Sequence, residues 1–343
     1  MASGIVDALL RSEEPSVQWR VRTEVLGEPG DAAELRRLRD RIRRSDRVRT
    51  LLGHRGPDGR SLVRRGIYAK WQGAHWALAA LADLGYPAGD DELRPLAEQL
   101  LDGWLGAEFY IEFEASAKPA AYARRGVPVM AGRHRRCASQ QGNALRSLCR
   151  LGLADDRTGA LVERLLHWQW PDGGWNCDKN PTADTSSFAE TLLPLRGLAA
   201  YAEGHDDHEA GQAARRAAEV LLTRRLLYRR SDGTLINAEF TRLHYPLYWH
   251  YDVLGGLRGL AELGMLGDPR CADALDLLVS KRLPDGGWPA EHRYYRTSAE
   301  VALGHDFVDW GGTSIRRSNP WVTVEALSVL RAAGVVDHAG VSR

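Results

Sequence analysis

The sequence predicts an all-α protein with the architecture of an (α/α)6 toroid, a double ring of inner and outer helices. Apolar residues recur at helical spacing in nearly every segment, and no segment shows the alternation of a β-strand. Two kinds of helix alternate along the chain, and a Pro-Asp-Gly turn recurs between them. In such a ring the inner helices surround a central cavity, and their N-terminal ends form its mouth.

One set of predicted helices is apolar nearly all round, as expected of buried inner helices. Five of the six end at a glycine, the residue that most easily adopts the left-handed conformation of a helix stop. We predict these inner helices at 16–27, 70–85, 139–152, 186–202, 249–264 and 320–334.

The other set is amphipathic and rich in charge, and several members open with an aspartate at an N-cap-like position. A short helix at residues 5–10 closes the alternation. The remaining outer helices are predicted at 31–52, 91–105, 156–168, 206–227 and 268–281.

The recurring turn reads Gln-Trp-Pro-Asp-Gly-Gly-Trp at 169–175 and Pro-Asp-Gly-Gly-Trp at 284–288. Proline presets the first corner of a turn, aspartate bonds its own backbone, and glycine accepts a positive φ. Weaker copies lie at 57–59 and 231–233. The four aspartates fit a repeat of roughly 57 residues, with one copy missing near position 115.

Composition narrows the class of protein. A repeat array can carry one continuous core, so we expect a single domain over residues 1–343. The net charge of +1 argues against nucleic acid or an anionic membrane as partner. No run approaches the roughly 18 apolar residues of a membrane span, and residues 1–10 do not resemble a signal peptide. Four cysteines without framework spacing fit a cytoplasmic location.

Two stretches interrupt the helical pattern. Residues 106–136 replace the missing turn, and residues 289–319 form a long insertion with Arg-Tyr-Tyr-Arg and Asp-Trp-Gly-Gly segments. Loops of this length in a compact helical domain are usually functional. We therefore expect both near one mouth of the ring. The oligomeric state is left open.

Polar and aromatic residues stand at the heads of several inner helices, which predicts a small-molecule cavity with aromatic walls and a few polar groups. The predicted substrate-binding residues are Trp71, Gln72, His75, Gln141, Asn143, His244, Trp249, Asp309, Trp310 and Trp321.

The stretch from His244 to Asp252 is a further candidate for chemistry. It places three tyrosines, a tryptophan, two histidines and an aspartate in nine residues before an inner helix. A histidine beside a carboxylate is a usual general base, and tyrosine is a common proton donor. His250, Tyr251 and Asp252 are the candidates for these roles. A hydrogen-bonded aromatic plug is the alternative interpretation.

The turns at 169–175 and 284–288, each followed by a polar segment and an inner helix, resemble the tryptophan-rich repeats of the squalene cyclase and protein prenyltransferase superfamily. The resemblance covers most of the chain and implies a single toroid with terpenoid cyclase-like repeats. It implies little about function, because such toroids host unrelated chemistries.

Class II terpene cyclases protonate an alkene or epoxide with the middle aspartate of an Asp-x-Asp-Asp-Thr motif at the head of an inner helix. The resemblance places Asp184 at that position, and the supporting carboxylates of the family become Thr182 and Thr185. Asp178 is the acidic residue left to approach Asp184 in space. Asp184 also fits an ordinary N-cap for the helix that starts near residue 186, and the two roles can coexist.

Protein prenyltransferases bind zinc through an Asp-x-Cys pair and a histidine, and no Asp-x-Cys occurs here. Cys177 with His244, His250 or Asp252 would make a zinc site with an open position. Polar groups lining a cavity are the alternative interpretation. No cofactor is predicted firmly, and zinc remains a possibility.

Three hypotheses follow. The first is a terpene cyclase-like enzyme that acts on an isoprenoid or other hydrophobic molecule through Asp184, with aromatic faces stabilising carbocations. The second is a lyase or hydrolase on a polar or carbohydrate-like substrate that uses His250, Tyr251 and Asp252. The third is a toroid that binds a small molecule without turnover. The first is the prediction that we carry forward.

Overall fold

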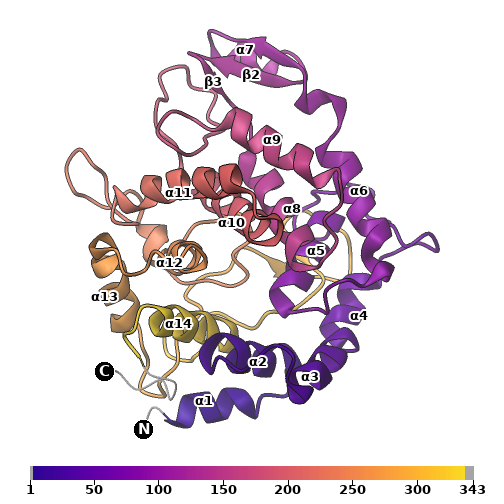
Figure 1. Ribbon diagram of the computed structural model, residues 1–343, viewed down its shortest axis with the longest axis vertical. Helices are drawn as coiled ribbons and strands as arrows, with labels where there is room; N and C mark the ends of the chain where they lie inside the picture. Colours follow the sequence, from indigo (N-terminus) through magenta and orange to yellow (C-terminus); the bar gives the residue numbers. More distant parts are fainter. Residues whose placement is uncertain (1–2, 337–343) are drawn as a thin grey trace.

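The computed structural model describes residues 3–336, and the chain is mostly helical within them (Figure 1). The predicted inner helices are present, and the first continues as a π-helical segment at Val21–Val25. They are α2 (Pro15–Arg20), α5 (Ala74–Leu84), α8 (Ala138–Arg150), α10 (Phe188–His205), α12 (Val253–Glu262) and α14 (Pro320–Ala332).

These six helices pack against one another in chain order. Helix α8 contacts α5 and α10, α12 contacts α10 and α14, and α14 contacts α2. The end of α5 meets α2, since a Cβ at Gly85 would lie 2.4 Å from the Trp19 ring. Their segments surround the middle of the molecule in Figure 1.

The second set of predicted helices is also present and includes α1 (Ser3–Leu10). The predicted helix at 31–52 is wrong in one respect: it is two helices, because Ser45 caps the second by accepting from the Val48 amide. The set continues with α3 (Ala33–Arg43), α4 (Asp46–Leu52), α6 (Arg94–Trp104), α9 (Thr158–Trp168), α11 (His208–Leu222) and α13 (Ala272–Ser280).

The recurring turns share one backbone geometry. In the first strong copy the Trp170 amide donates to the Gly174 carbonyl at 2.8 Å, and the Gly173 amide donates back to Trp170 at 2.9 Å. In the second strong copy Leu283 bonds Gly287 in the same way. The third residue of each loop, Gly173 or Gly286, has φ near +97° or +86°. Glycine is needed there because other residues rarely adopt this conformation.

The all-α prediction is wrong in the two insertions, where short strands form. In the first insertion β1 (Glu112–Glu114) runs parallel to β2 (Val127–Met130), which pairs antiparallel with β3 (Arg133–His134). In the second, β4 (Arg296–Thr297) runs parallel to β5 (His305–Asp306). Strands of two to four residues are too short to show an alternating pattern in the sequence.

The insertions occupy different places. The first, with its short helix α7 (Lys118–Tyr122), lies beyond α9 at one end of the molecule (Figure 1). It has its own small core of Phe113, Ala115, Ala121 and Met130. The second reaches the head of α5, where the Trp71 amide donates to the His305 carbonyl at 2.8 Å. The second insertion therefore covers the inner helices.

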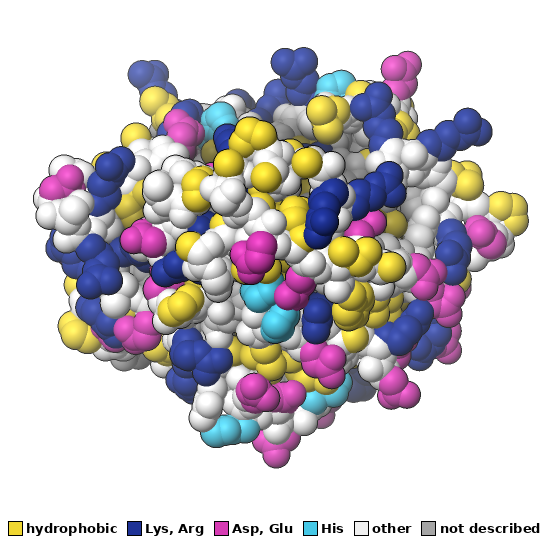
Figure 2. Space-filling model, turned by 90° about the horizontal axis from the view of Figure 1, so that it is seen from above, with side chains coloured by type: hydrophobic (Ala, Val, Ile, Leu, Met, Phe, Trp, Pro, Cys, Tyr) yellow, Lys and Arg dark blue, Asp and Glu magenta, His cyan; other side chains and the backbone are white. Residues whose placement is uncertain are grey.

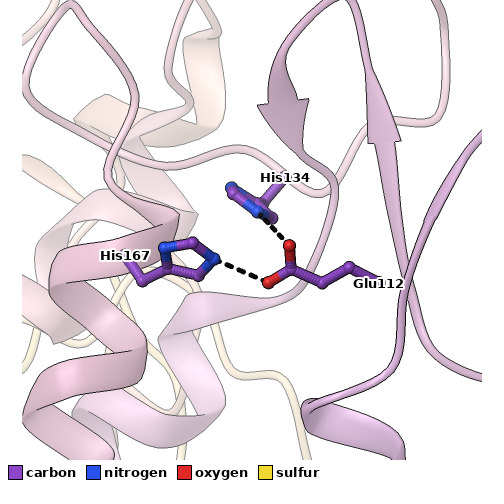
Figure 3. Close-up of side chains that lie close together, drawn as sticks. All are labelled: Glu112, His134 and His167. Atoms are coloured by element: carbon purple, nitrogen blue, oxygen red, sulfur yellow. Dashed lines mark hydrogen bonds and ion pairs between the residues drawn. The ribbon is translucent and has the colours of Figure 1, made fainter.

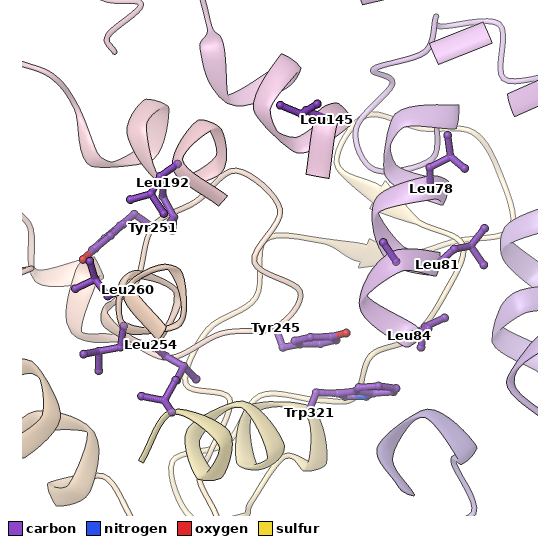
Figure 4. Close-up of a cluster of buried hydrophobic side chains, with 14 of the residues drawn as sticks. Leu78, Leu81, Leu84, Leu145, Leu192, Tyr245, Tyr251, Leu254, Leu260 and Trp321 are labelled. Carbon is purple, nitrogen blue, oxygen red and sulfur yellow. The ribbon is translucent and has the colours of Figure 1, made fainter. Parts of the chain in front are cut away.

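The hydrophobic core lies largely between the two sets of helices. Leu78, Leu81 and Leu84 are fully buried, and Figure 4 shows them on the side of α5 that faces away from the middle of the view. Tyr245 and Trp321 stack on the other side of α5, near α14, with ring centroids 5.2 Å apart. Because the leucines face outward, the inward faces of the helices are left for other residues.

The end of the molecule shown in Figure 2 has a mixed surface. Basic and acidic side chains are interspersed there, and histidines lie beside acidic groups near its middle. Within residues 3–336, none of the helices is both long enough and apolar enough to cross a bilayer.

Candidate functional site

A small cavity lies between α5, α8 and α10, beneath the segment that precedes α12 and beneath the second insertion. Water can occupy about 30 Å³ of it, room for about one or two molecules. The aromatic lining residues are Trp71, Trp76, Tyr245, Tyr248 and Trp310, and the polar ones are Asp83, Asn143, Arg146, Arg196 and Asp306.

The aromatic wall is a packed set of rings. Trp71 stacks on Tyr248, with centroids 3.9 Å apart and planes 12° from parallel. Trp76 meets both rings edge-on, at 4.7 Å and 5.4 Å. Rings in this arrangement present π faces that attract a positive charge. Trp71 and Trp310 are predicted binding residues that do line the cavity.

Asp306 is the carboxyl group among these rings, and it is only 3% exposed. Tyr248 Oη donates to it at 2.5 Å and Trp310 Nε1 at 2.8 Å. The Val308 amide donates to its other oxygen at 2.9 Å. Burial raises the pKa of Asp306, and these three donors oppose the rise. The result is a carboxyl group that holds its proton more strongly than an exposed aspartate.

Arg146 is the cation with donors to spare in this cavity. Its Nη1 lies 2.9 Å from Asp83, whereas its buried Nε and Nη2 make no hydrogen bond. Burial, together with neighbouring Arg196, lowers the pKa of Arg146 to about 10. Arg196 uses its Nε and Nη2 in a two-point contact with Glu262, at 2.8 and 2.7 Å. An acceptor group on a ligand would find its free donors on Arg146.

A buried ion network continues from this cavity toward α2 and α14. Arg258 lies 2.5 Å from Glu325 and 3.4 Å from Glu24. Arg20 lies 3.0 Å from Glu24 and 3.4 Å from Glu325. Every one of the six inner helices or their direct extensions thus contributes a charged residue to the interior. Breaking such a pair typically costs more than forming it gains.

His75 and Asn143 form a neutral polar pair at the cavity, and Asn143 lines it. Trp104 Nε1 donates to His75 Nδ1 at 3.1 Å, and Asn143 Nδ2 lies 3.1 Å from His75 Nε2. Burial lowers the pKa of His75 to about 3, which keeps the ring neutral so that Nδ1 can accept. Gln141 donates to the Trp104 carbonyl at 3.1 Å and lies outside the cavity lining.

His250, Tyr251 and Asp252 do not form a joint site. Asp252 pairs with His244 instead, at 2.9 Å, and caps α12 by accepting from the Gly255 amide at 2.7 Å. Tyr251 donates to the Leu226 carbonyl at 2.8 Å. Between the described residues His250 and Asp252 there is no ion pair or hydrogen bond. The paired carboxylate raises the pKa of buried His244 against the effect of burial.

His250 lies in a stack of rings. Tyr294 covers one face at 3.4 Å between centroids, and Trp249 lies at 4.0 Å. Lys70 sits over the Trp249 ring at 4.8 Å. Burial lowers the pKa of His250 to about 3. This set corresponds to the aromatic plug that was the alternative interpretation of the stretch.

Asp184 is exposed, and so is Asp178. The Asp184 carboxylate accepts from Thr185 Oγ1 at 3.1 Å. The predicted cap role of Asp184 is wrong, because Ser187 caps α10. The loop stays on the surface through local turns, in which Asp178 accepts from the amide two residues later. Neither carboxylate lines the cavity.

The other predicted binding residues hold the second insertion. Gln72 donates to the Glu300 carbonyl at 2.7 Å and accepts from the Ala302 amide at 3.0 Å. Asp309 is exposed and accepts from the Gly311 amide. Trp321 stacks on Tyr245 behind the cavity. None of these three residues lines the cavity.

Cys177 does not join His244 or His250, so the zinc site considered from the sequence does not form. Within residues 3–336, two other sets bring together three possible metal ligands. One is Glu112, His134 and His167, where each histidine contacts one carboxylate oxygen, at 3.1 and 2.7 Å (Figure 3). The other contains Cys177 with Cys137 and Glu190.

The sequence carried a signal for some residues that were missed. Asp83 is the one acidic or basic residue of α5 apart from His75, and Arg146 and Arg196 are buried arginines of α8 and α10. A charge in a buried helix indicates an interior polar site. Asp306 had no comparable signal, because its burial depends on the path of the second insertion. No protein-family model and no curated protein matches this chain.

Proposed function

We propose that the chain is an enzyme that starts a cyclisation or isomerisation by transferring a proton to a small hydrophobic molecule in the central cavity. The proposal rests on one observation above all: Asp306 is a buried carboxyl group with a raised pKa among aromatic rings. It keeps the class of reaction that the sequence predicted and replaces Asp184 with Asp306 as the acid.

The proposal includes the finer architecture, an (α/α)6 toroid related to the squalene cyclase and protein prenyltransferase group. The six inner helices pack in chain order, and α14 returns to α2, which supports a ring. The shared geometry of the turns at 170–174 and 283–287 supports a repeat. An experimental structure with the inner helices splayed into two layers would contradict the ring.

The reaction requires one proton donor and one stabilised cation. Asp306 gives its proton to the substrate and becomes a carboxylate, which keeps hydrogen bonds from Tyr248, Trp310 and the Val308 amide. The positive charge on the substrate faces the Trp71 and Tyr248 rings. Loss of a proton from the rearranged cation restores the acid, so the step needs no oxidant or reductant.

The strength of the acid limits the class of substrate that it can protonate. A carboxyl group with a raised pKa is a weaker acid than an exposed one, and proton transfer is efficient when donor and acceptor are matched. The proton acceptor is therefore an oxygen or a polarised double bond, as in an epoxide or an enol ether. A polar acceptor elsewhere on the substrate would bind the free donors of Arg146.

The cavity has to enlarge before a substrate of this kind enters, because only about 30 Å³ of it is accessible to water. The segment to move is the second insertion, which hydrogen-bonds to residues 70–72. Gln72 makes two of those bonds. Opening there exposes Asp306 and Trp310 together.

The small free volume also favours a second candidate, a module without turnover whose cavity is filled by its own side chains. This candidate predicts that no small molecule enters. Binding of a ligand in the central cavity would contradict this second candidate.

The test is product analysis by mass spectrometry after incubation with linear prenyl diphosphates, squalene and oxidosqualene. Because oxidosqualene is the epoxide of this set, we expect a rearranged product from it with the wild type and with Asp184→Asn. Asp306→Asn should lose at least about 100-fold of this activity, as for other general acids. Asp309→Asn is the matched control three residues away. Turnover that survives in Asp306→Asn would overturn the assigned acid, and no turnover with any substrate would favour the second candidate.

A further inference from the structure

Three potential metal ligands converge at the heads of two inner helices. Cys137 is the residue before α8, Glu190 lies in the first turn of α10, and Cys177 follows the first strong turn. Their donor atoms all lie within 4.8 Å of one another, and Cys177 Sγ is 3.2 Å from Glu190 Oε1. The cluster is separate from the residues that line the cavity.

Glu190 is a buried carboxyl group without a cation beside it. Its residue is 8% exposed, and it accepts hydrogen bonds from the Ser139 amide at 3.0 Å and from the Cys177 thiol. No ion pair within residues 3–336 includes it. Buried carboxylates are normally paired with a cation or bound to a metal. A metal ion would supply the missing positive charge.

The surroundings also suit a cluster that becomes negative. Arg136 and Lys179 lie close enough to interact electrostatically with both Cys137 and Cys177. When two thiolates and a carboxylate bind a divalent ion, one negative charge remains. These two cations would offset that charge.

The second strong turn shows that the fold does not need these ligands. Position for position after the shared tryptophans, Cys177 corresponds to Ala290, and Glu190 corresponds to Val322 after the shared helix caps. The turn and its inner helix form with apolar residues there. The polar cluster is therefore an addition to the scaffold.

We propose that Cys137, Cys177 and Glu190 bind one zinc ion, with a fourth position open to water or a ligand. Two thiolates favour a soft or borderline ion over magnesium or calcium. Tetrahedral bond lengths place such donors roughly 3.5–3.8 Å apart, which this cluster reaches with small side-chain shifts. This inference does not depend on the proposed function.

The cluster lies near the aromatic residues of the interior. Tyr68 is close enough for the charge of Glu190 to contribute, after burial, to raising its pKa. The same tyrosine ring contacts His75 and Trp76 at 5.1 and 5.0 Å. Trp76 lines the central cavity.

The set of Glu112, His134 and His167 is the competing metal site. Its side chains are 15–46% exposed, and its carboxylate already has a histidine on each oxygen (Figure 3). It therefore has no unsatisfied buried charge that calls for an ion. Its removal by His167→Ala serves as a control.

The experiment is titration of the reduced, chelator-treated protein with Zn²⁺ against a chromophoric chelator, and with Co²⁺ followed by absorption. We expect one tight equivalent and a thiolate-to-cobalt charge-transfer band. Cys177→Ser and Glu190→Gln should weaken binding by at least about 100-fold, because even outer-shell changes cost 10–100-fold. Cys149→Ser, Cys271→Ser and His167→Ala should bind as the wild type does.

Alkylation tests the site where a variant fails to fold. In the wild-type protein Zn²⁺ should protect Cys137 and Cys177 from a thiol reagent, read peptide by peptide, and leave the labelling of Cys149 unchanged. The proposal is overturned if the wild type shows no thiolate-to-cobalt band, or if zinc affinity is unchanged in Cys177→Ser. A disulfide between Cys137 and Cys177 that persists under reducing conditions would also overturn it.

Discussion

Each of the two strong turns of the chain joins the helix before it to the helix after it, and both turns do so by equivalent contacts. Trp175 Nε1 donates to the Leu165 carbonyl of α9 at 2.9 Å, and Trp288 Nε1 donates to the Leu278 carbonyl of α13 at 2.7 Å. Each indole is thus fixed to the outer helix before it. The two turns act as equivalent clamps.

The inner helix is held in an equivalent way. The amide of Trp175 donates to Thr191 Oγ1 at 3.3 Å, and the amide of Trp288 donates to Thr323 Oγ1 at 2.9 Å. The residues that follow each clamp differ. Eleven residues, 176–186, follow the first clamp and run over the surface, whereas 289–318 follow the second and cover the cavity. The comparison separates a repeated scaffold from two different additions.

Removing the indoles should have the largest effect. Both rings are at most 1% exposed, so Trp175→Ala and Trp288→Ala should each cost about 3–5 kcal/mol of unfolding free energy. Urea unfolding followed by circular dichroism measures both. Losses that differ by more than about 2 kcal/mol would show that the two clamps are not equivalent.

The pH dependence of the unfolding free energy tests the buried environment of His75. His75 has a folded-state pKa of about 3 against 6.5 when exposed, so the unfolded chain binds more protons between these values. Its contribution to stability is complete above pH 6.5 and falls by about 1.4 kcal/mol per unit as the pH drops toward 3. His75→Gln should reduce this slope by up to about 1.4 kcal/mol per pH unit, the contribution of one proton. An unchanged slope would mean that His75 is protonated in the fold.

The threonines should show a smaller effect. Replacing Thr191 or Thr323 with valine keeps the shape and removes the acceptor for a buried tryptophan amide, at a cost of about 1–3 kcal/mol. The shorter bond predicts the larger loss for Thr323→Val. The reverse order in urea unfolding would show that bond length does not rank the two clamps.

The sequence predicted the parts of the fold that depend on local pattern. Helix periodicity and glycine stops located α5, α8 and α14 to within a few residues. The two-residue strand β5 was missed because it depends on pairing between distant segments. The clamps were visible as turns, but their bonds to the helices were not.

The candidate site was predicted in part, for a similar reason. Asn143 in α8 and Trp71 just before α5 line the cavity as predicted, and Trp310 reaches it from the second insertion. Asp184 was chosen by likeness to a motif, whereas local side-chain turns keep its loop at the surface. Asp306 enters the cavity only because the insertion folds back to residues 70–72, which no local pattern encodes.

The most direct test is infrared difference spectroscopy of the protonated carboxyl group over a pH titration, comparing the wild type with Asp306→Asn. The account predicts a carbonyl band that persists above pH 3.8, the value of an exposed aspartate, and that is absent in Asp306→Asn and retained in Asp309→Asn. If the Asp306 band titrates at or below pH 3.8, the carboxyl group is ionised under working conditions and cannot be the proton donor.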